Sequence, residues 1–394
     1  MSPKDSSDET PMPMPTTIIY EPKQFIEARS SQTTAIVAGR PYDPTIKVEV
    51  NNDASIINAT LSILFPNDKD IGTTLSEKLS VKTVTGGITN ALYCVSGFDS
   101  VKDYNSVLVR VFGAEGMIDR DVETCTFAAL SDNKIAPPYY GRFGNGRLEG
   151  FLDNYVPLTL SDFQVSETYQ EIAVKMAELH SGFSVPNELK EWHNEEEPGL
   201  WGQLYSWMEQ AKGIKVYKTE SDNERAASLL DLDALERELN WVKTIVSDES
   251  KVGFSHNDLL SGNIMKNELN GAIKLIDFEY GGVNFIAFDI ANHFNEWAGG
   301  PDNAAGKTDY SLFPSKEQQR DFISSYVRSA SGSEEADDEK TELLMGEVKA
   351  FLLANHLYWG LWAVNQAAVE GTEEFDYLAY AVNRFNRFFE TKED

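Results

Sequence analysis

The hydrophobic and polar positions of the chain follow one period before about residue 153 and another after it. From about residue 76, short segments such as "KLSVKTVT", "ALYCVSG" and "SVLVRVFG" alternate β-branched with polar residues and end at glycine or asparagine. This pattern predicts the strands of a small antiparallel sheet. Two further segments, "PYYGRF" and "GRLEGFLD", flank Asn145 and Gly146, a dipeptide that favours a tight hairpin turn.

Helical spacing appears once in this first part, in "DRDVETCTFAALSD" at residues 119–132, whose first turn is acidic as a helix start favours. After residue 153 the helical period dominates. We therefore predict an α+β fold with two lobes, a small sheet lobe over residues 45–152 and a larger, mainly helical lobe over residues 153–394. Residues 1–44 are rich in proline and small polar residues without a sustained period, which is typical of a flexible tail.

Composition and charge narrow the class of protein. The chain has 394 residues, of which 41% are hydrophobic, enough for a sizeable core in each lobe. Its formal net charge of −29 would repel phosphate backbones and anionic membranes, so a nucleic-acid partner is not expected. An acidic field would attract cationic small molecules, although solubility is the simpler explanation for the charge.

The positions of the cysteines and the length of the apolar runs indicate where in the cell the protein is expected. Cys94 and Cys125 lie in apolar segments outside any metal-binding spacing, which fits a reducing environment. The first residues hold no apolar leader segment, and no run of 18 apolar residues occurs. We therefore expect a cytoplasmic protein with no membrane insertion, and we expect the apolar segment "FLLANHLYWGLWAV" to be a buried helix.

The strongest candidate chemistry lies in "GFSHNDLLSGN". A short run of Asn, Asp, Ser and Gly is more often a capped turn than a site. Here, however, His256, Asp258 and Asn263 have the spacing H-x-D-x-x-x-x-N, and the strand "KLIDFEY" follows and carries Asp277. This is the spacing of a kinase catalytic loop and its metal-binding strand end. One carboxylate can accept a proton from the attacking hydroxyl, while an amide oxygen and a second carboxylate hold Mg²⁺ against the phosphates of ATP.

The sheet lobe supplies further parts of such a site. A glycine-rich turn that contains Gly87 and Asn90 could lay backbone N–H groups over phosphates, although it suits a plain hairpin equally well. On a strand, Arg110 stands where protein kinases carry a phosphate-binding lysine, and Glu123 on the next helix is its expected partner. A surface ion pair of little energetic value is the alternative for these two residues.

Six segments together carry a resemblance to a known family: "GGITN", "VLVRVFG", "IDRDVE", "HNDLLSGNI", "IDFEYGGVNFIAFDIANHFNEWAG" and "HLYWGLWAVNQA". They resemble the choline/ethanolamine kinases, which have a protein-kinase-like two-lobed fold. The similarity runs from about residue 45 to 390. Within it, "IDRDVE" and "NHFNEWAG" are more similar to the ethanolamine kinases than to the choline kinases.

This resemblance implies a role for each residue of the motif. Asp258 would be the catalytic base, and Asn263 and Asp277 the metal ligands. Arg110 would contact the nucleotide phosphates with Glu123 as its partner.

The resemblance also places the adenine against residues 149–153, which include Glu149 and Leu152. The family usually has a polar residue where this chain has Gly150, which leaves nucleotide preference open. A longer insertion, "GPDNAAGKTD" at residues 300–309, would lie near the substrate mouth.

The amine end of the substrate requires a different pocket. Trp359 and Trp362 are three residues apart on one helix, and Tyr377 and Tyr380 repeat this spacing on the next. Such a stripe is most often core. Beside the carboxylate of Glu296, however, aromatic faces can enclose a cation. The resemblance favours this box, so Glu296, Trp359, Trp362 and Tyr380 are predicted to bind the amine.

Other polar residues are expected to be structural. Asp289 and Asn292 would brace the catalytic loop through hydrogen bonds. His180, His293 and His356 lack a metal-binding spacing to one another.

The sequence therefore predicts an ATP- and Mg²⁺-dependent kinase that phosphorylates the hydroxyl of the small amino alcohol ethanolamine. The product, phosphoethanolamine, would feed phosphatidylethanolamine synthesis, as the resemblance implies. A choline kinase, or one that accepts both amines, is the nearest alternative. An antibiotic phosphotransferase would not need the tryptophan pair, a protein kinase would carry an APE segment, and an inactive scaffold would not need the intact motif. The sequence does not determine the oligomeric state and is compatible with a homodimer.

Overall fold

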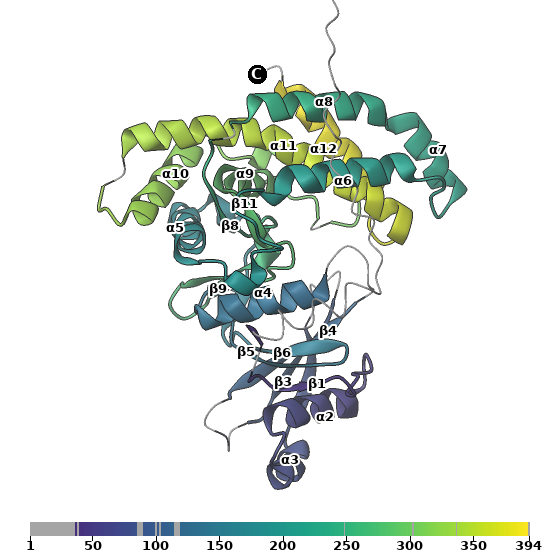
Figure 1. The fold of residues 1–394 in the computed structure, drawn as a ribbon, viewed down its shortest axis with the longest axis vertical. Coiled ribbons are helices and arrows are strands. Elements are labelled where there is room, and N and C mark those ends of the chain that lie inside the picture. Colours follow the sequence, from purple (N-terminus) through teal and green to yellow (C-terminus); the bar gives the residue numbers. More distant parts are fainter. Residues whose placement is uncertain are drawn as a thin grey trace, which may run out of the picture.

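The structure is a computed structural model of the chain. It describes residues 36, 37, 39–84, 90–98, 101, 104–113, 119–247, 249–301, 303–335 and 337–392. Two lobes are plain in Figure 1, a smaller one that carries the main sheet and a larger one that is mostly helical. The predicted α+β, two-lobed architecture is thereby confirmed.

The smaller lobe is built on a six-stranded sheet with the order β1-β5-β6-β4-β3-β2. Its strands are β1 Tyr42–Asp43, β2 Ser80–Val84, β3 Asn90–Ser96, β4 Ser106–Phe112, β5 Tyr139–Phe143 and β6 Gly146–Gly150. Neighbouring strands are antiparallel, as predicted, except for the edge pair β1 and β5, which is parallel. The expected hairpin joins β5 and β6 across Asn145.

The edge strand β1 falls within the range predicted as a flexible tail. The carbonyl oxygen of Pro41 accepts a hydrogen bond from the backbone N–H of Arg142 at 3.0 Å. The Arg142 guanidinium carbon lies 4.1 Å from the centroid of the Tyr42 ring. A strand of two residues is too short to show alternation, so the pattern could not reveal it. Residues 1–35 and residue 38 of the predicted tail lie outside the described residues.

Within the described residues, three α-helices accompany this sheet: α2 Asp53–Leu64, α3 Lys69–Ser76 and α4 Arg120–Asp132. Helix α4 was predicted, and the side chain of Asp119 caps its first turn. Helices α2 and α3 were not predicted. Helix α2 begins after Asn52, whose side chain accepts from the Ser55 N–H, and it buries Ile56 and Ile63. In Figure 1, α4 lies on the side of the sheet that faces the larger lobe.

The larger lobe contains eight described α-helices and two small sheets. The helices are α5 Ser166–Gly182, α6 Gly199–Gly213, α7 Glu220–Leu229, α8 Leu232–Ile245, α9 Ile286–Glu296, α10 Lys316–Ser331, α11 Asp338–Glu370 and α12 Tyr377–Lys392. The strands are β7 Tyr155–Pro157, β8 Val252–Ser255, β9 Ile264–Asn267, β10 Ile273–Leu275 and β11 Gly282–Phe285, in the orders β10-β9-β7 and β11-β8. Because β7 pairs with β9, the chain passes between the lobes after β6.

Helix α11 occupies the centre of this lobe and packs against five other helices. Its middle is buried nearly all round, which explains why "FLLANHLYWGLWAV" is so apolar. None of the helices in the described part of the chain is long and apolar enough to cross a membrane.

Candidate active site

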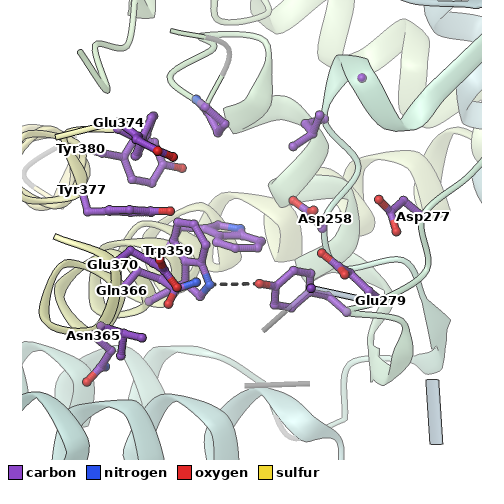
Figure 2. A pocket seen from close by; sticks show the side chains of 18 of the residues that line it. Asp258, Asp277, Glu279, Trp359, Asn365, Gln366, Glu370, Glu374, Tyr377 and Tyr380 are labelled. Carbon is purple, nitrogen blue, oxygen red and sulfur yellow. Dashed lines mark hydrogen bonds between the residues drawn. The ribbon is translucent and has the colours of Figure 1, made fainter. Parts of the chain in front are cut away.

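The predicted catalytic loop lies between β8 and β9, where two antiparallel pairs bring separate parts of the chain together. Strand β8 pairs with β11, and β9 pairs with β10, which ends just before Asp277. As a result Asp258, Asn263 and Asp277 line one cavity of about 1460 Å³. Figure 2 shows the carboxylates of Asp258, Asp277 and Glu279 on one side of this cavity.

Asp289 on α9 holds the start of the loop, as predicted. Its two carboxylate oxygens accept from the backbone N–H groups of His256, at 2.9 Å, and Asn257, at 2.7 Å. The ring of His180 lies 2.9 Å from the same carboxylate. Burial alone would raise the pKa of Asp289, but the bond to His180 and the neighbouring backbone donor hold it below its ordinary value. Asp289 is therefore a charged anchor for the loop.

The prediction that Asn292 also braces the loop is wrong. Its side-chain oxygen accepts from Trp359 Nε1 at 2.6 Å and from Asn355 Nδ2 at 2.8 Å, so it holds α11 instead. The next residue, His293, contacts the catalytic loop instead, because its Nδ1 donates to the carbonyl oxygen of Leu259 at 3.0 Å. Burial lowers the pKa of His293 to about 4, so its ring is neutral at neutral pH.

Two residues of the site adopt the left-handed backbone conformation. Asn257 has a φ of 65° and Asp277 a φ of 62°. Asn and Asp tolerate this conformation better than other non-glycine residues. Asn257 is fixed further by its side chain, which donates to the Tyr280 carbonyl oxygen at 2.9 Å and accepts from Asn284 at 2.8 Å. These two hydrogen bonds link the loop to the segment that follows Asp277.

The side-chain amide of Asn263 has a defined orientation. Its nitrogen donates to the backbone oxygen of Asp258 at 2.8 Å and to the Asp258 carboxylate at 3.3 Å. Its oxygen therefore points the other way. Together with the carboxylate of Asp277 it offers the hard oxygen donors that Mg²⁺ prefers. The described ranges hold no group of three or more His, Cys, Asp or Glu side chains placed to hold a metal ion.

The carboxyl group of Asp258 lies among other acids. Loss of contact with water raises its pKa well above the ordinary value, and the charges of Glu296, Glu279 and Asp277 raise it further. A strongly raised pKa in a cavity is typical of an acid or base that handles protons.

The four residues predicted to bind the amine come together in the same cavity, which Glu296, Trp359, Trp362 and Tyr380 all line. The two tryptophan rings meet edge to face, with centroids 5.4 Å apart. Trp362 Nε1 donates to the hydroxyl of Tyr280 at 3.0 Å, the bond drawn in Figure 2.

Glu296 is not an isolated anion. Its Oε1 lies 3.2 Å from a guanidinium nitrogen of Arg384 on α12, and both side chains are almost fully buried. Arg384 also donates to the hydroxyl of Tyr380 at 3.4 Å and to the side-chain oxygen of Asn355. The carboxylate predicted to attract the amine is therefore held from behind by a cation.

Seven charged side chains, some in the cavity wall and the others behind it, alternate in sign and form the charged network: Asp277, Arg110, Glu149, Arg147, Glu123, Arg120 and Glu279. The prediction that Arg110 pairs with Glu123 is wrong. Arg110 instead donates to Glu149 at 2.8 Å and to Asp277 at 3.2 Å, while Glu123 lies 2.6 Å from Arg147. Burial would raise the pKa of Glu149, but the two arginines hold it below its ordinary value.

The predicted nucleotide contacts are not brought into this cavity. Asn90, Arg110, Glu123, Glu149 and Leu152 are all absent from its described lining. Arg110, Glu123 and Glu149 are buried in the charged network, and the Asn90 side chain lies 3.5 Å from Glu279.

Of three further features expected near the site, the structure places two. Gly87 lies outside the described residues. At Gly150, a side chain would approach the ring of Pro138 to 2.7 Å, which explains the glycine at this position. The insertion at residues 300–309 borders the cavity at Pro301, and Gly306 and Gly300 pack against Tyr380.

Sequence reasoning missed several residues of the site. Asn257 and Tyr280 lie inside the quoted motifs, between and beside the residues that were chosen. Arg384 could have been found, because a charged residue interrupts the apolar stripe of Ala381, Phe385 and Phe388 on α12. Arg120 and Arg147 gave no such signal, since only the fold shows what their guanidinium groups contact.

Comparison with known proteins identifies the family of the chain. A family model described as choline/ethanolamine kinase matches residues 81–389. The "Probable ethanolamine kinase A" of Dictyostelium discoideum is 35% identical over 334 residues, covering 84% of this chain and 88% of the relative. The "Probable choline kinase 1" of Arabidopsis thaliana is 34% identical over 324 residues, covering 79% and 87%.

Solved structures similar to this chain also include both ethanolamine kinases and choline kinases. An ethanolamine kinase from Plasmodium vivax superposes with a TM-score of 0.71 at 25% identity, covering 94% of this chain and 96% of its own. A choline kinase from Cryptosporidium parvum has the same TM-score at 27% identity, covering 87% and 96%. The predicted kinase-like fold is confirmed, and both kinds of relative occur, so these similarities do not resolve the amine. The chain belongs to the choline/ethanolamine kinase family.

Proposed function

We propose that the protein transfers the γ-phosphoryl group of ATP to the hydroxyl of ethanolamine and releases phosphoethanolamine and ADP. The observation that carries this proposal is a single cavity lined by a catalytic group, Asp258, Asn263 and Asp277, and by an amine-binding group that consists of Glu296 and the aromatic rings. A small amino alcohol can present its hydroxyl to the first group and its ammonium to the second. Both substrates dissolve in water, so the reaction requires no membrane segment.

Asp258 is the proposed base. Its carboxylate accepts the hydroxyl proton as the substrate oxygen forms a bond to the γ-phosphorus and the bond to the ADP oxygen breaks. The anchored backbone of His256 and Asn257 keeps this carboxylate in place. Asn263 and Asp277 would hold a Mg²⁺ ion, which neutralises phosphate charge when it is bound.

The ammonium group would lie between Glu296 and the rings of Trp359, Trp362 and Tyr380. A primary ammonium has three N–H donors and requires oxygen acceptors, whereas a trimethylammonium has none and is satisfied by aromatic faces. Glu296 supplies an oxygen acceptor at this end of the substrate, which favours ethanolamine. The three rings are the specific observation that supports choline as the second candidate.

A graded series of amines tests the proposal. ADP release from Mg-ATP should be measured with ethanolamine, its N-methyl and N,N-dimethyl derivatives, and choline. We expect kcat/KM to fall along this series, because each methyl group removes one N–H donor. A rise along the series would make the protein a choline kinase. If no amine is turned over, a different acceptor or a binding role replaces the proposal.

The pH profile of kcat/KM for ATP should show an acid limb above the range of an ordinary aspartate. Asp258 must be ionised to accept a proton, and its surroundings raise its pKa, so activity is lost as pH falls through that raised value. Replacing Glu279 with glutamine removes one neighbouring charge and should move the limb to lower pH. A parent limb near pH 4, the range of an ordinary aspartate, would contradict this role for Asp258.

A further inference from the structure

The cavity is acidic, although the proposed reaction must bring a polyanion into it. Its described lining includes seven carboxylates: Asp258, Asp277, Glu279, Glu296, Glu370, Glu373 and Glu374. The same lining includes two cations, Arg120 and Lys218. Lys218 donates to the backbone oxygen of Glu370 at 3.0 Å, and Figure 2 shows Glu370 across the cavity from Asp277 and Glu279. Of these two cations, Arg120 is therefore the one beside the predicted catalytic groups.

Arg110, the cation predicted to contact phosphate, already forms ion pairs with two carboxylates. Its side chain is 4% exposed, and its Nε and Nη1 donate to Glu149 and Asp277. By binding the buried Glu149 and the cavity-lining Asp277 in this way, the Arg110 guanidinium orients Asp277, but Arg110 is absent from the described lining of the cavity. The phosphates would need a second cation.

Arg120 is placed to supply that charge. It is the first residue of α4, in the smaller lobe, and its Nη1 lies 3.2 Å from Glu279, two residues after Asp277 in the larger lobe. Its side chain is 16% exposed, against 4% for Arg110 and 0% for Arg147. Both of its ion pairs, with Glu279 and Glu123, use Nη1, so the planar fork keeps other N–H groups for a ligand.

We infer that Arg120 binds the terminal phosphate of the nucleotide and stabilises the charge on the phosphoryl group as it transfers. This inference rests on the proposed function, because it assumes that the cavity accepts ATP. A guanidinium matches phosphate oxygens with two parallel hydrogen bonds, and here it would act beside Asp277 on the same phosphate. The hydroxyl proton goes to Asp258, so Arg120 takes no part in proton transfer. Glu279 holds the guanidinium at the cleft before the nucleotide enters.

The test compares nucleotides of different length. Binding of ATP, ADP and AMP should be titrated with Mg²⁺ present and the amine absent, in the parent and in Arg120→Ala, Arg120→Lys and Glu279→Gln. We expect Arg120→Ala to weaken ATP binding roughly tenfold with ADP and AMP within about twofold, and to lower kcat by on the order of 10²-fold or more with little change in KM for the amine. The ATP affinity and kcat of Arg120→Lys should lie between those of the parent and Arg120→Ala, because lysine keeps the positive charge but cannot form two parallel hydrogen bonds to phosphate.

Arg142→Ala is the matched control. Arg142 pairs with Asp121 on the same helix at 3.1 Å but lies outside the described lining, so the variant should bind all three nucleotides as the parent does. The inference is overturned if Arg120→Ala weakens ATP and ADP equally, if it binds the nucleotides as Arg142→Ala does, or if it changes nothing. Selective loss of ATP binding in an enzyme that phosphorylates no amine would refute the proposed substrate and still support the role of Arg120.

Discussion

Replacing Asp258 with asparagine is expected to lower kcat by roughly 10²–10⁴-fold, because the amide keeps the shape of the side chain and cannot accept the hydroxyl proton. The variant should fold normally. Partial removal from water and three nearby acids raise the pKa of Asp258, so the folded protein loses stability as pH rises from the ordinary value of an aspartate to that raised value and the group ionises. Asparagine has no such cost. The melting temperature of the variant should equal or exceed that of the parent, with a larger difference at pH 8 than at pH 5.

Turnover, ATP binding and thermal unfolding at both pH values would check this prediction together. Asp162→Asn is a suitable control, because the half-buried Asp162 carboxylate accepts hydrogen bonds from Thr159 and lies outside the described lining of the cavity. Its kcat should match the parent. Near-normal turnover in the Asp258 variant would exclude Asp258 as the base, and a large loss of stability would show that its carboxylate is a structural anchor instead.

Replacing Arg147 with alanine should lower the free energy of unfolding by about 3–5 kcal/mol, the usual cost of breaking a buried ion pair on one side. The Arg147 side chain is fully buried between Glu123, at 2.6 Å, and Glu149, at 2.7 Å. Its guanidinium carbon also lies 4.3 Å from the centroid of the Phe127 ring. Alanine would leave two carboxylates without this cation and would open a cavity beside the ring.

Urea unfolding of the parent and the variant measures this loss. Arg320→Ala is the matched control, because Arg320 also contacts two acids, Asp338 and Glu342, but is 42% exposed. Exposed pairs of this kind contribute only about 0–1 kcal/mol. If the free energy of unfolding falls by a similar amount in both variants, burial does not determine how much the charged network contributes to stability.

The strands and long helices of the fold could be read from the chain because their periods are sustained. Strands β3 and β4 have seven residues each, and α4 shows both an acidic first turn and a regular apolar face. Strand β1 has two residues, and α2 and α3 lie in a stretch for which no element was predicted. The parallel pairing of β1 depends on Arg142, about a hundred residues later, which a local pattern cannot show.

The candidate site was predictable where residues carry their chemistry close together in sequence. Asp258 and Asn263 belong to one loop, and Asp277 follows a strand that pairs with the strand after that loop. Partner choice was not predictable in the same way. Arg110 has two acids nearby in the fold besides Glu123, and only the positions of β6 and Asp277 decide which of them it contacts.

The charged network also constrains how this chain can diverge from its relatives. Its members come from β4, β6, α4 and the segment after β10, so no single stretch of sequence contains them. A lone charge change would leave an excess buried charge, whereas a compensated pair of changes would not. Among relatives that share about a third of their residues with this chain, we expect these positions to be kept or to change in pairs. Substitutions at Arg147 should therefore be accompanied by changes at Glu123 or Glu149.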